Sequence, residues 1–181
     1  MNRESPSMVY VQESVDFIVS AAQYCSTLES IASHEGLAIG RDKLLTICSY
    51  MYVRSLELPT TESSPFITLE HRVTEDQYES IRTALEQYFG GNDIFLDADL
   101  REMRYSEVPV SVSISESLSD VYQVLADTVW IYKLGVEENM MEALAEAKET
   151  FRYEWGSKLL KVMNRLHELI TEGDQEWQED E

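Results

Sequence analysis

PVSVSISESLSDVYQVLADTVWIYKLGVEENMMEALAEAKETFRYEWGSKLLKVMNRLHELIT, residues 109–171, is the stretch that decides the fold of this chain. Gly135 divides it, and further apolar runs at helical spacing follow at 140–151 and 159–170. Three amphipathic helices this close together must pack on one another or on helices upstream. The first of them repeats its apolar side chains in steps of three and four, the period of a helix rather than of a strand. These side chains are Val110, Ile114, Leu118, Val121, Leu125, Val129 and Tyr132.

The upstream half of the chain predicts three more helices. Apolar side chains at helical spacing mark a long helix over 8–33 and a second over 42–56. The second helix ends at Pro59, because the residue before a proline is pushed out of helical geometry. The third covers 74–89 and begins with a capping box at Thr74. The sequence therefore predicts an all-α, single-domain, irregular bundle of about six main helices.

Three segments do not share this clear helical pattern. Residues 60–72 are rich in Ser and Thr and predict a surface loop of about a dozen residues. Residues 92–106 are ambiguous and could hold a short helix. The Ser-Val alternation at 111–115 could form a strand, but no partner strand is evident, so a helix beginning near Pro109 is favoured. Both ends of the chain are expected to be loose tails: residues 1–7 and 173–181.

The net charge limits the classes of partner that this chain can bind. The 181 residues contain 34 Asp and Glu against 14 Lys and Arg, which gives a formal charge of −20. Such a chain is repelled by phosphate backbones and anionic membranes, so neither a nucleic acid nor a membrane is an expected partner. A basic protein partner is compatible with this charge. The oligomeric state stays open.

The cysteines and the hydropathy pattern predict a cytoplasmic protein. Cys25 and Cys48 lie inside apolar helical runs without the spacing of a zinc site or a disulfide framework, so both are expected to be buried free thiols. The first residues have no apolar core typical of a signal peptide. No run approaches the roughly 18 apolar residues of a membrane span.

Several motifs together carry a family resemblance. They are ISESLSDVYQ (114–123), the Lys133-Leu134-Gly135 break, MEAL (141–144), Phe151-x-x-x-Trp155-Gly156 followed by LLKVMNRLHEL, and VTEDQYESIR (73–82). They resemble a bacterial family of domains of unknown function, number 5063, over nearly the whole chain. The resemblance implies an all-helical domain and no particular activity. The family pattern often has a His before the Trp-Gly pair where this chain has Glu154, so any role of that histidine does not carry over.

The sequence predicts no metal centre and no cofactor. A dinuclear metal site in a helical bundle uses Glu-x-x-His pairs, but none of the three histidines (His34, His71 and His167) has a Glu three residues before it. Glu146 and Glu149 match half of the paired-carboxylate pattern that holds magnesium, and no second half follows. A solvated acidic face is the favoured interpretation of this pair. Nor is there a phosphate-binding loop or a complete nucleophile motif.

A seam between two predicted helices holds the best candidate site. Polar and aromatic side chains at such seams can line a small-molecule pocket, or can hydrogen-bond one another and fix how the helices pack. The candidates are Asp120, Tyr122 and Gln123 on one helix and Trp155, Asn164 and His167 on the other. Lys158, Lys161 and Arg165 form a basic strip nearby, for which a salt-bridged, solvated face is the favoured interpretation.

Two functional hypotheses follow. The absence of a complete catalytic motif favours a non-enzymatic cytoplasmic module for protein interaction or regulation, with another protein as the possible partner. The alternative is a small-ligand-binding protein or metal-dependent enzyme with its site between the helices of 118–132 and 155–170. That alternative predicts a concave pocket that holds at least two of Asp120, Gln123 and His167.

Overall fold

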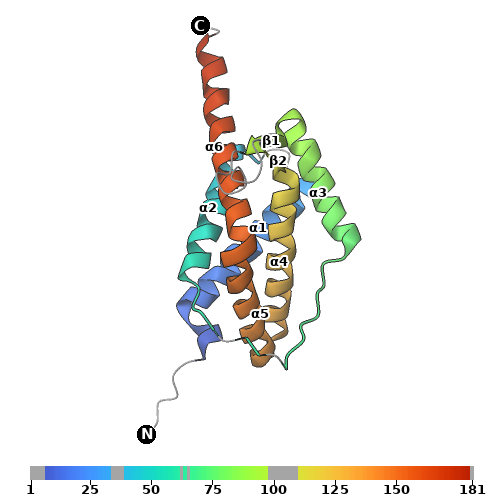
Figure 1. The fold of residues 1–181 in the computed structure, drawn as a ribbon, viewed down its shortest axis with the longest axis vertical. Coiled ribbons are helices and arrows are strands. Elements are labelled where there is room, and N and C mark those ends of the chain that lie inside the picture. Colours follow the sequence, from blue (N-terminus) through green and yellow to red (C-terminus); the bar gives the residue numbers. More distant parts are fainter. Residues whose placement is uncertain (1–6, 34–38, 62, 65, 98–109, 180–181) are drawn as a thin grey trace.

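The computed structural model describes residues 7–33, 39–61, 63–64, 66–97 and 110–179, with side chains through residue 172. The predicted all-α fold is confirmed (Figure 1). The elements in order are the short helix η1 (Met8–Tyr10), α1 (Gln12–Ala32), α2 (Arg41–Glu57), α3 (Glu75–Phe89), η2 (Gly90–Asn92), β1 (Ile94–Asp97), β2 (Val110–Ser113), α4 (Ile114–Leu134), α5 (Glu137–Thr150), the π-helical turn η3 (Phe151–Trp155) and α6 (Gly156–Glu179). No described helix combines the length and the apolar character that crossing a membrane requires.

Helix α4 is the central element of the bundle. It packs against α1, α3, α5 and α6. The predicted stripe is buried from Ile114 through Val129 and forms the middle of the core. Tyr24 on α1 donates a buried hydrogen bond of 2.9 Å to the carbonyl of Leu118 and so ties α1 to α4. The helix ends as expected at Gly135, whose φ of 73° is a left-handed conformation that favours glycine.

The local signal predicted at Thr74 is confirmed in the structure. Thr74 caps α3 in a full capping box, since its side chain accepts from the Gln77 backbone N–H and the Gln77 side chain accepts from the Thr74 backbone N–H.

The last two helical runs of the sequence are joined without a break, because α5 passes into α6 through the π-helical turn η3. Helix α6 then continues to Glu179 and extends beyond the other helices (Figure 1), so residues 173–179 of the expected loose tail are helical.

The favoured helix start near Pro109 is wrong, because α4 begins only at Ile114, and the described part of the ambiguous segment 92–106 contains a strand rather than a short helix. Ile94–Asp97 and Val110–Ser113 are antiparallel strands, with Ile94 opposite Ser113 and Asp97 opposite Val110. The buried Asp93 holds this arrangement, because its Oδ1 accepts the Ser115 backbone N–H at 2.7 Å at the start of α4. The Asp93 carboxylate therefore accepts a hydrogen bond from an N–H of the first turn of α4 that has no partner within the helix. Asp93 also directly precedes β1, so it connects the strand to the start of α4.

Some sequence predictions concern residues outside the described part of the chain. These are residues 1–6 of the N-terminal tail, His34 and the linker around Gly36, and residues 98–109 between the two strands.

Both cysteines are buried free thiols, as predicted, and they give the protein a specific pH dependence. Burial raises the pKa of Cys48 from 9.0 to about 12 and raises the pKa of Cys25 even further. Above about pH 9 these thiols keep their protons in the folded protein but lose them in the unfolded chain, where their pKa is not raised. The free energy of unfolding therefore has its full value below about pH 9 and falls as the pH rises further.

We expect the free energy of unfolding to fall by about 1.5 kcal/mol between about pH 8 and about pH 9.5 as a result. Urea unfolding at both pH values, followed by circular dichroism, measures this loss. The Cys25→Ala/Cys48→Ala variant is expected to lose most of the pH dependence. An unchanged slope in this variant would mean that other groups cause it.

Candidate functional site

The structure does not bring the six predicted site residues together. Asp120 accepts a hydrogen bond of 2.7 Å from the Tyr78 hydroxyl of α3 and forms an ion pair with Lys158 of α6. The hydroxyl of Tyr122 instead donates to Glu29 of α1 at 2.9 Å. Gln123 turns to another side of α4, where it lines a pocket with residues of α5. These three positions of α4 thus contact three different neighbours.

The three candidates downstream are also separated. Trp155 is buried and donates its indole N–H to Thr150 at 3.1 Å. Asn164 is exposed and donates to Glu168 at 3.0 Å. His167 is exposed as well. The pocket that contains Gln123 is lined by neither Asp120 nor His167.

The predicted basic strip is salt-bridged, as its favoured interpretation required. Lys158 pairs with Asp120, Lys161 Nζ lies 2.7 Å from Asp97, and Arg165 lies 3.1 Å from Glu168. These bases of α6 hold neighbouring elements or their own helix, so the strip is an internal ion-pair system.

The segment between α2 and α3 is the feature that organises the site. It has no regular structure in its described part and crosses the bundle along α4 and α5 (Figure 1). Two buried charged groups of α5 hold the chain here: Glu142 binds the first half of the segment, and Lys148 binds the end of α2 that leads into it. Glu142 accepts from the Ser63 hydroxyl at 2.5 Å and the Ser64 backbone at 2.7 Å. Lys148 donates to the carbonyls of Ser55 and Leu56, the last turn of α2, at 2.7 and 2.9 Å.

Asp127 of α4 holds the second half of the segment. Its Oδ1 accepts the backbone N–H groups of Arg72 at 2.7 Å and Val73 at 2.9 Å. Its Oδ2 lies 3.1 Å from Nδ1 of His71. The Asp127 side chain is 7% exposed, whereas that of His71 is 60% exposed. A buried carboxylate thus fixes both the backbone and the imidazole at this point of the segment.

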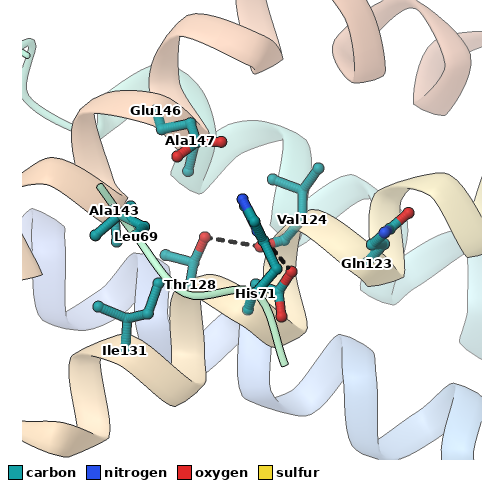
Figure 2. A pocket seen from close by; sticks show the side chains of 10 residues that line it. Leu69, His71, Gln123, Val124, Thr128, Ile131, Ala143, Glu146 and Ala147 are labelled. Carbon is teal, nitrogen blue, oxygen red and sulfur yellow. Dashed lines mark hydrogen bonds and ion pairs between the residues drawn. The ribbon is translucent and has the colours of Figure 1, made fainter. Parts of the chain in front are cut away.

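The His71 imidazole is therefore oriented. An ionised carboxylate only accepts, so Nδ1 of His71 is the donor in this hydrogen bond, and Nε2 is an acceptor when the ring is neutral. Figure 2 shows the ring reaching from the segment toward α5, with its outer nitrogen directed at the turn that carries Glu146 and Ala147. This acceptor faces a pocket rather than the core.

The pocket beside His71 is small, with a volume of about 120 Å³. The segment, α4 and α5 all contribute to its lining. Its polar groups are the side chains of Gln123, Asp127, Thr128, Glu146 and His71, and its apolar walls are Leu69, Val124, Ile131, Ala143 and Ala147. Figure 2 shows these side chains arranged around the opening.

The groups of this pocket can bind a ligand. The Thr128 hydroxyl donates to the Val124 carbonyl at 2.7 Å, so it is not presented to His71 as a nucleophile. Asp127 is occupied by two backbone N–H groups and the imidazole. Within the described residues, no group of three His, Cys, Asp or Glu side chains is placed to hold a metal ion. Glu146 and His71 Nε2 remain as acceptors toward a ligand.

Sequence reasoning missed both Asp127 and His71 as site residues. The sequence offers His71 only as a possible metal ligand, and no motif points to Asp127. One signal could have found Asp127, because it lies among the buried residues of α4, next to Thr128 and Val129. A carboxylate on the buried face of a helix needs a partner, and an irregular segment can supply it through backbone N–H groups.

Comparisons with known proteins agree with the helical architecture. The family described as "Domain of unknown function (DUF5063)" matches residues 8–172. The chain is similar to the crystal structure of protein BF1032 from Bacteroides fragilis, with 28% sequence identity and a TM-score of 0.75, over 90% of this chain and 95% of that one. No curated protein matches the chain.

Proposed function

We propose that this chain, which belongs to the DUF5063 family, is a non-enzymatic protein-interaction module that receives a basic side chain of its partner beside His71. The observation that carries the proposal is the pairing of an oriented imidazole with the Glu146 carboxylate in a small pocket with apolar walls.

The size of the pocket favours a single side chain over a cofactor. Sites that enclose drug-sized ligands occupy about 300–1,000 Å³. The pocket beside His71 has about 120 Å³, well below that range. It suits one side chain of a partner, which the rest of the partner surface would hold in place. This is the arrangement of an anchor residue at a protein interface.

The lining suits a side chain with an aliphatic stem and a cationic head. Leu69, Ile131 and Ala143 offer apolar surface to methylene groups. Glu146 offers a negative charge, and His71 Nε2 offers an acceptor. Lysine and arginine carry several donors and no acceptor, so either would match this set. The formal charge of −20 adds a long-range attraction for a basic partner.

We also propose that the protein acts in the bacterial cytoplasm. Two buried free thiols are compatible with a reducing compartment. The similar protein BF1032 comes from the bacterium Bacteroides fragilis.

A selection of random peptides against the folded protein tests the proposed function. We expect the enriched peptides to share a Lys or Arg at one position, and replacement of that residue by norleucine to abolish measurable binding. Glu146→Gln is expected to weaken the best peptide about tenfold, as removal of one charge-assisted hydrogen bond does. Isothermal titration calorimetry measures both effects.

Glu149→Gln is the matched control for this experiment. Glu149 is also an exposed acid on α5, one turn away, and does not line the pocket, so this variant has the same net charge as Glu146→Gln. We expect it to bind like the wild type. Enriched peptides without a basic residue, or equal weakening by both variants, would contradict the proposed function.

A further inference from the structure

A second pocket lies on the other side of the same segment. It has a volume of about 240 Å³ and is formed by α1, α4 and the chain that leads into α3. Its lining is mostly polar and includes charges of both signs, in contrast to the pocket beside His71. The side chains that matter for its chemistry are Glu29, Arg72, Gln77, Tyr122, Trp130 and Lys133.

The bases in this pocket are unusual for such an acidic chain. Most basic side chains in the described part of the protein bind a carboxylate, a hydroxyl or a backbone carbonyl. Among the described residues, Arg72, Lys133 and Lys43 have side chains with no hydrogen bond or ion pair to the protein. Two of these three line the same pocket. The pocket therefore presents two cations that form no ion pair with a carboxylate among the described residues.

The same pocket contains one partly used carboxylate. Glu29 accepts the Tyr122 hydroxyl through Oε1, and its Oε2 has no partner among the described residues. Burial and the hydrogen bond to Glu29 raise the pKa of Tyr122, and the positive charge of Arg72 opposes that shift. Tyr122 is thus a donor to Glu29 throughout the neutral range and holds the carboxylate at the pocket.

We propose that this pocket binds a small zwitterion of the size of an amino acid. Its anionic group would lie between Arg72 and Lys133, and its ammonium group would bind the free oxygen of Glu29. Trp130 would supply a flat wall, on which a cation or an apolar side chain packs well. The volume of 240 Å³ is too small for a nucleotide. This site does not depend on the proposed interaction with a partner protein.

The backbone of Arg72 is already positioned for this role. Its N–H is bound by Asp127, so the residue is fixed on α4 while its side chain makes no bond within the protein. A fixed backbone lowers the entropy lost when a ligand binds. The backbone of Arg72 binds Asp127, and its side chain would bind the ligand. A substitution of the Arg72 side chain therefore leaves the backbone hydrogen bond to Asp127 in place.

The test is calorimetric titration of the full chain with the common amino acids and with inorganic phosphate. We expect one amino acid, or a group of similar ones, to bind with a Kd tighter than about 1 mM. The N-acetylated and the amidated forms of the best ligand are each expected to bind at least about tenfold more weakly, because each has lost one of its two charges.

Variants locate the site. Arg72→Gln, Lys133→Gln and Glu29→Gln are each expected to weaken binding about tenfold. Lys43→Gln is the matched control, since Lys43 is the third base without a partner and does not line this pocket. The proposal is overturned by the absence of any binding tighter than about 1 mM, by phosphate binding as well as the best amino acid, or by equal binding in Arg72→Gln and the wild type.

Discussion

Asp127→Ala is expected to lower the free energy of unfolding by about 4 kcal/mol. The substitution removes the acceptor of two backbone N–H groups, those of Arg72 and Val73, which bind the same carboxylate oxygen at 2.7 and 2.9 Å. Each of these part-buried donors costs on the order of 1–3 kcal/mol when it is left without a partner. The Asp127 side chain is 7% exposed, so water replaces these bonds poorly. Urea denaturation followed by circular dichroism measures the loss.

Asp127→Asn separates geometry from charge at the same position. An asparagine keeps one oxygen, and this oxygen can accept both backbone bonds while the amide group faces His71. We therefore expect Asp127→Asn to cost only about 1 kcal/mol. His71→Ala is expected to cost about 0.5 kcal/mol, because its imidazole is 60% exposed. Equal losses in the alanine and asparagine variants would show that the negative charge, rather than the acceptor, stabilises the segment.

Hydrogen exchange gives an independent readout of the same bonds. The amides of Arg72 and Val73 are expected to be protected in the wild type and in Asp127→Asn, and to exchange rapidly in Asp127→Ala. The amide of Ser64 binds Glu142 at the other end of the segment and should keep its protection. Loss of protection at Ser64 as well would mean that the segment is released as one unit.

The helices could be predicted because their signals are local. The stripe of α4 repeats within the helix itself, and the capping box at Thr74 lies within four residues. The glycine that ends α4 acts at its own position. In each case the residues that carry the signal are neighbours in the sequence, so the period and the cap are visible without knowledge of the fold.

The strands and the site could not be predicted because their partners are distant. Asp93 meets Ser115 across 22 positions, and β1 shows no signal of its own that points to β2. Asp127 meets Arg72 across 55 positions. An irregular segment has no period from which its path can be read. The seam chosen as a candidate site failed to assemble for a related reason, since successive positions of α4 face different neighbours.

Gly156→Ala is expected to destabilise the protein by about 3 kcal/mol, opposite in sign to the usual effect of this change. An alanine in a helix interior is normally better than glycine by about 1 kcal/mol. At Gly156, however, an added Cβ would lie 2.4 Å from the backbone carbonyl oxygen of Phe151 and 2.9 Å from its ring. The first of these atoms belongs to the backbone and cannot rotate away.

The cause of this close contact is the π-helical turn η3. The Gly156 N–H binds the Phe151 carbonyl five residues back, which brings that oxygen next to the glycine. The atoms that an added Cβ would meet all belong to Phe151, in the preceding turn of the same chain. The turn also places Phe151 against Trp155, with ring centroids 4.8 Å apart, and against Tyr52 at 5.1 Å. An alanine would have to displace this cluster.

Gly91→Ala is the matched control, because a Cβ there would meet no atom within 4 Å and the backbone has no positive φ. We expect it to change the free energy of unfolding by less than about 0.5 kcal/mol. Thermal and urea unfolding of both variants measure the difference, and near-UV circular dichroism reports the packing of the aromatic rings. A Gly156→Ala variant as stable as the wild type would mean that the π-helical turn can convert to a regular helix at little cost. In that case the π-helical turn would not be required for the packing of the core around Phe151 and Trp155.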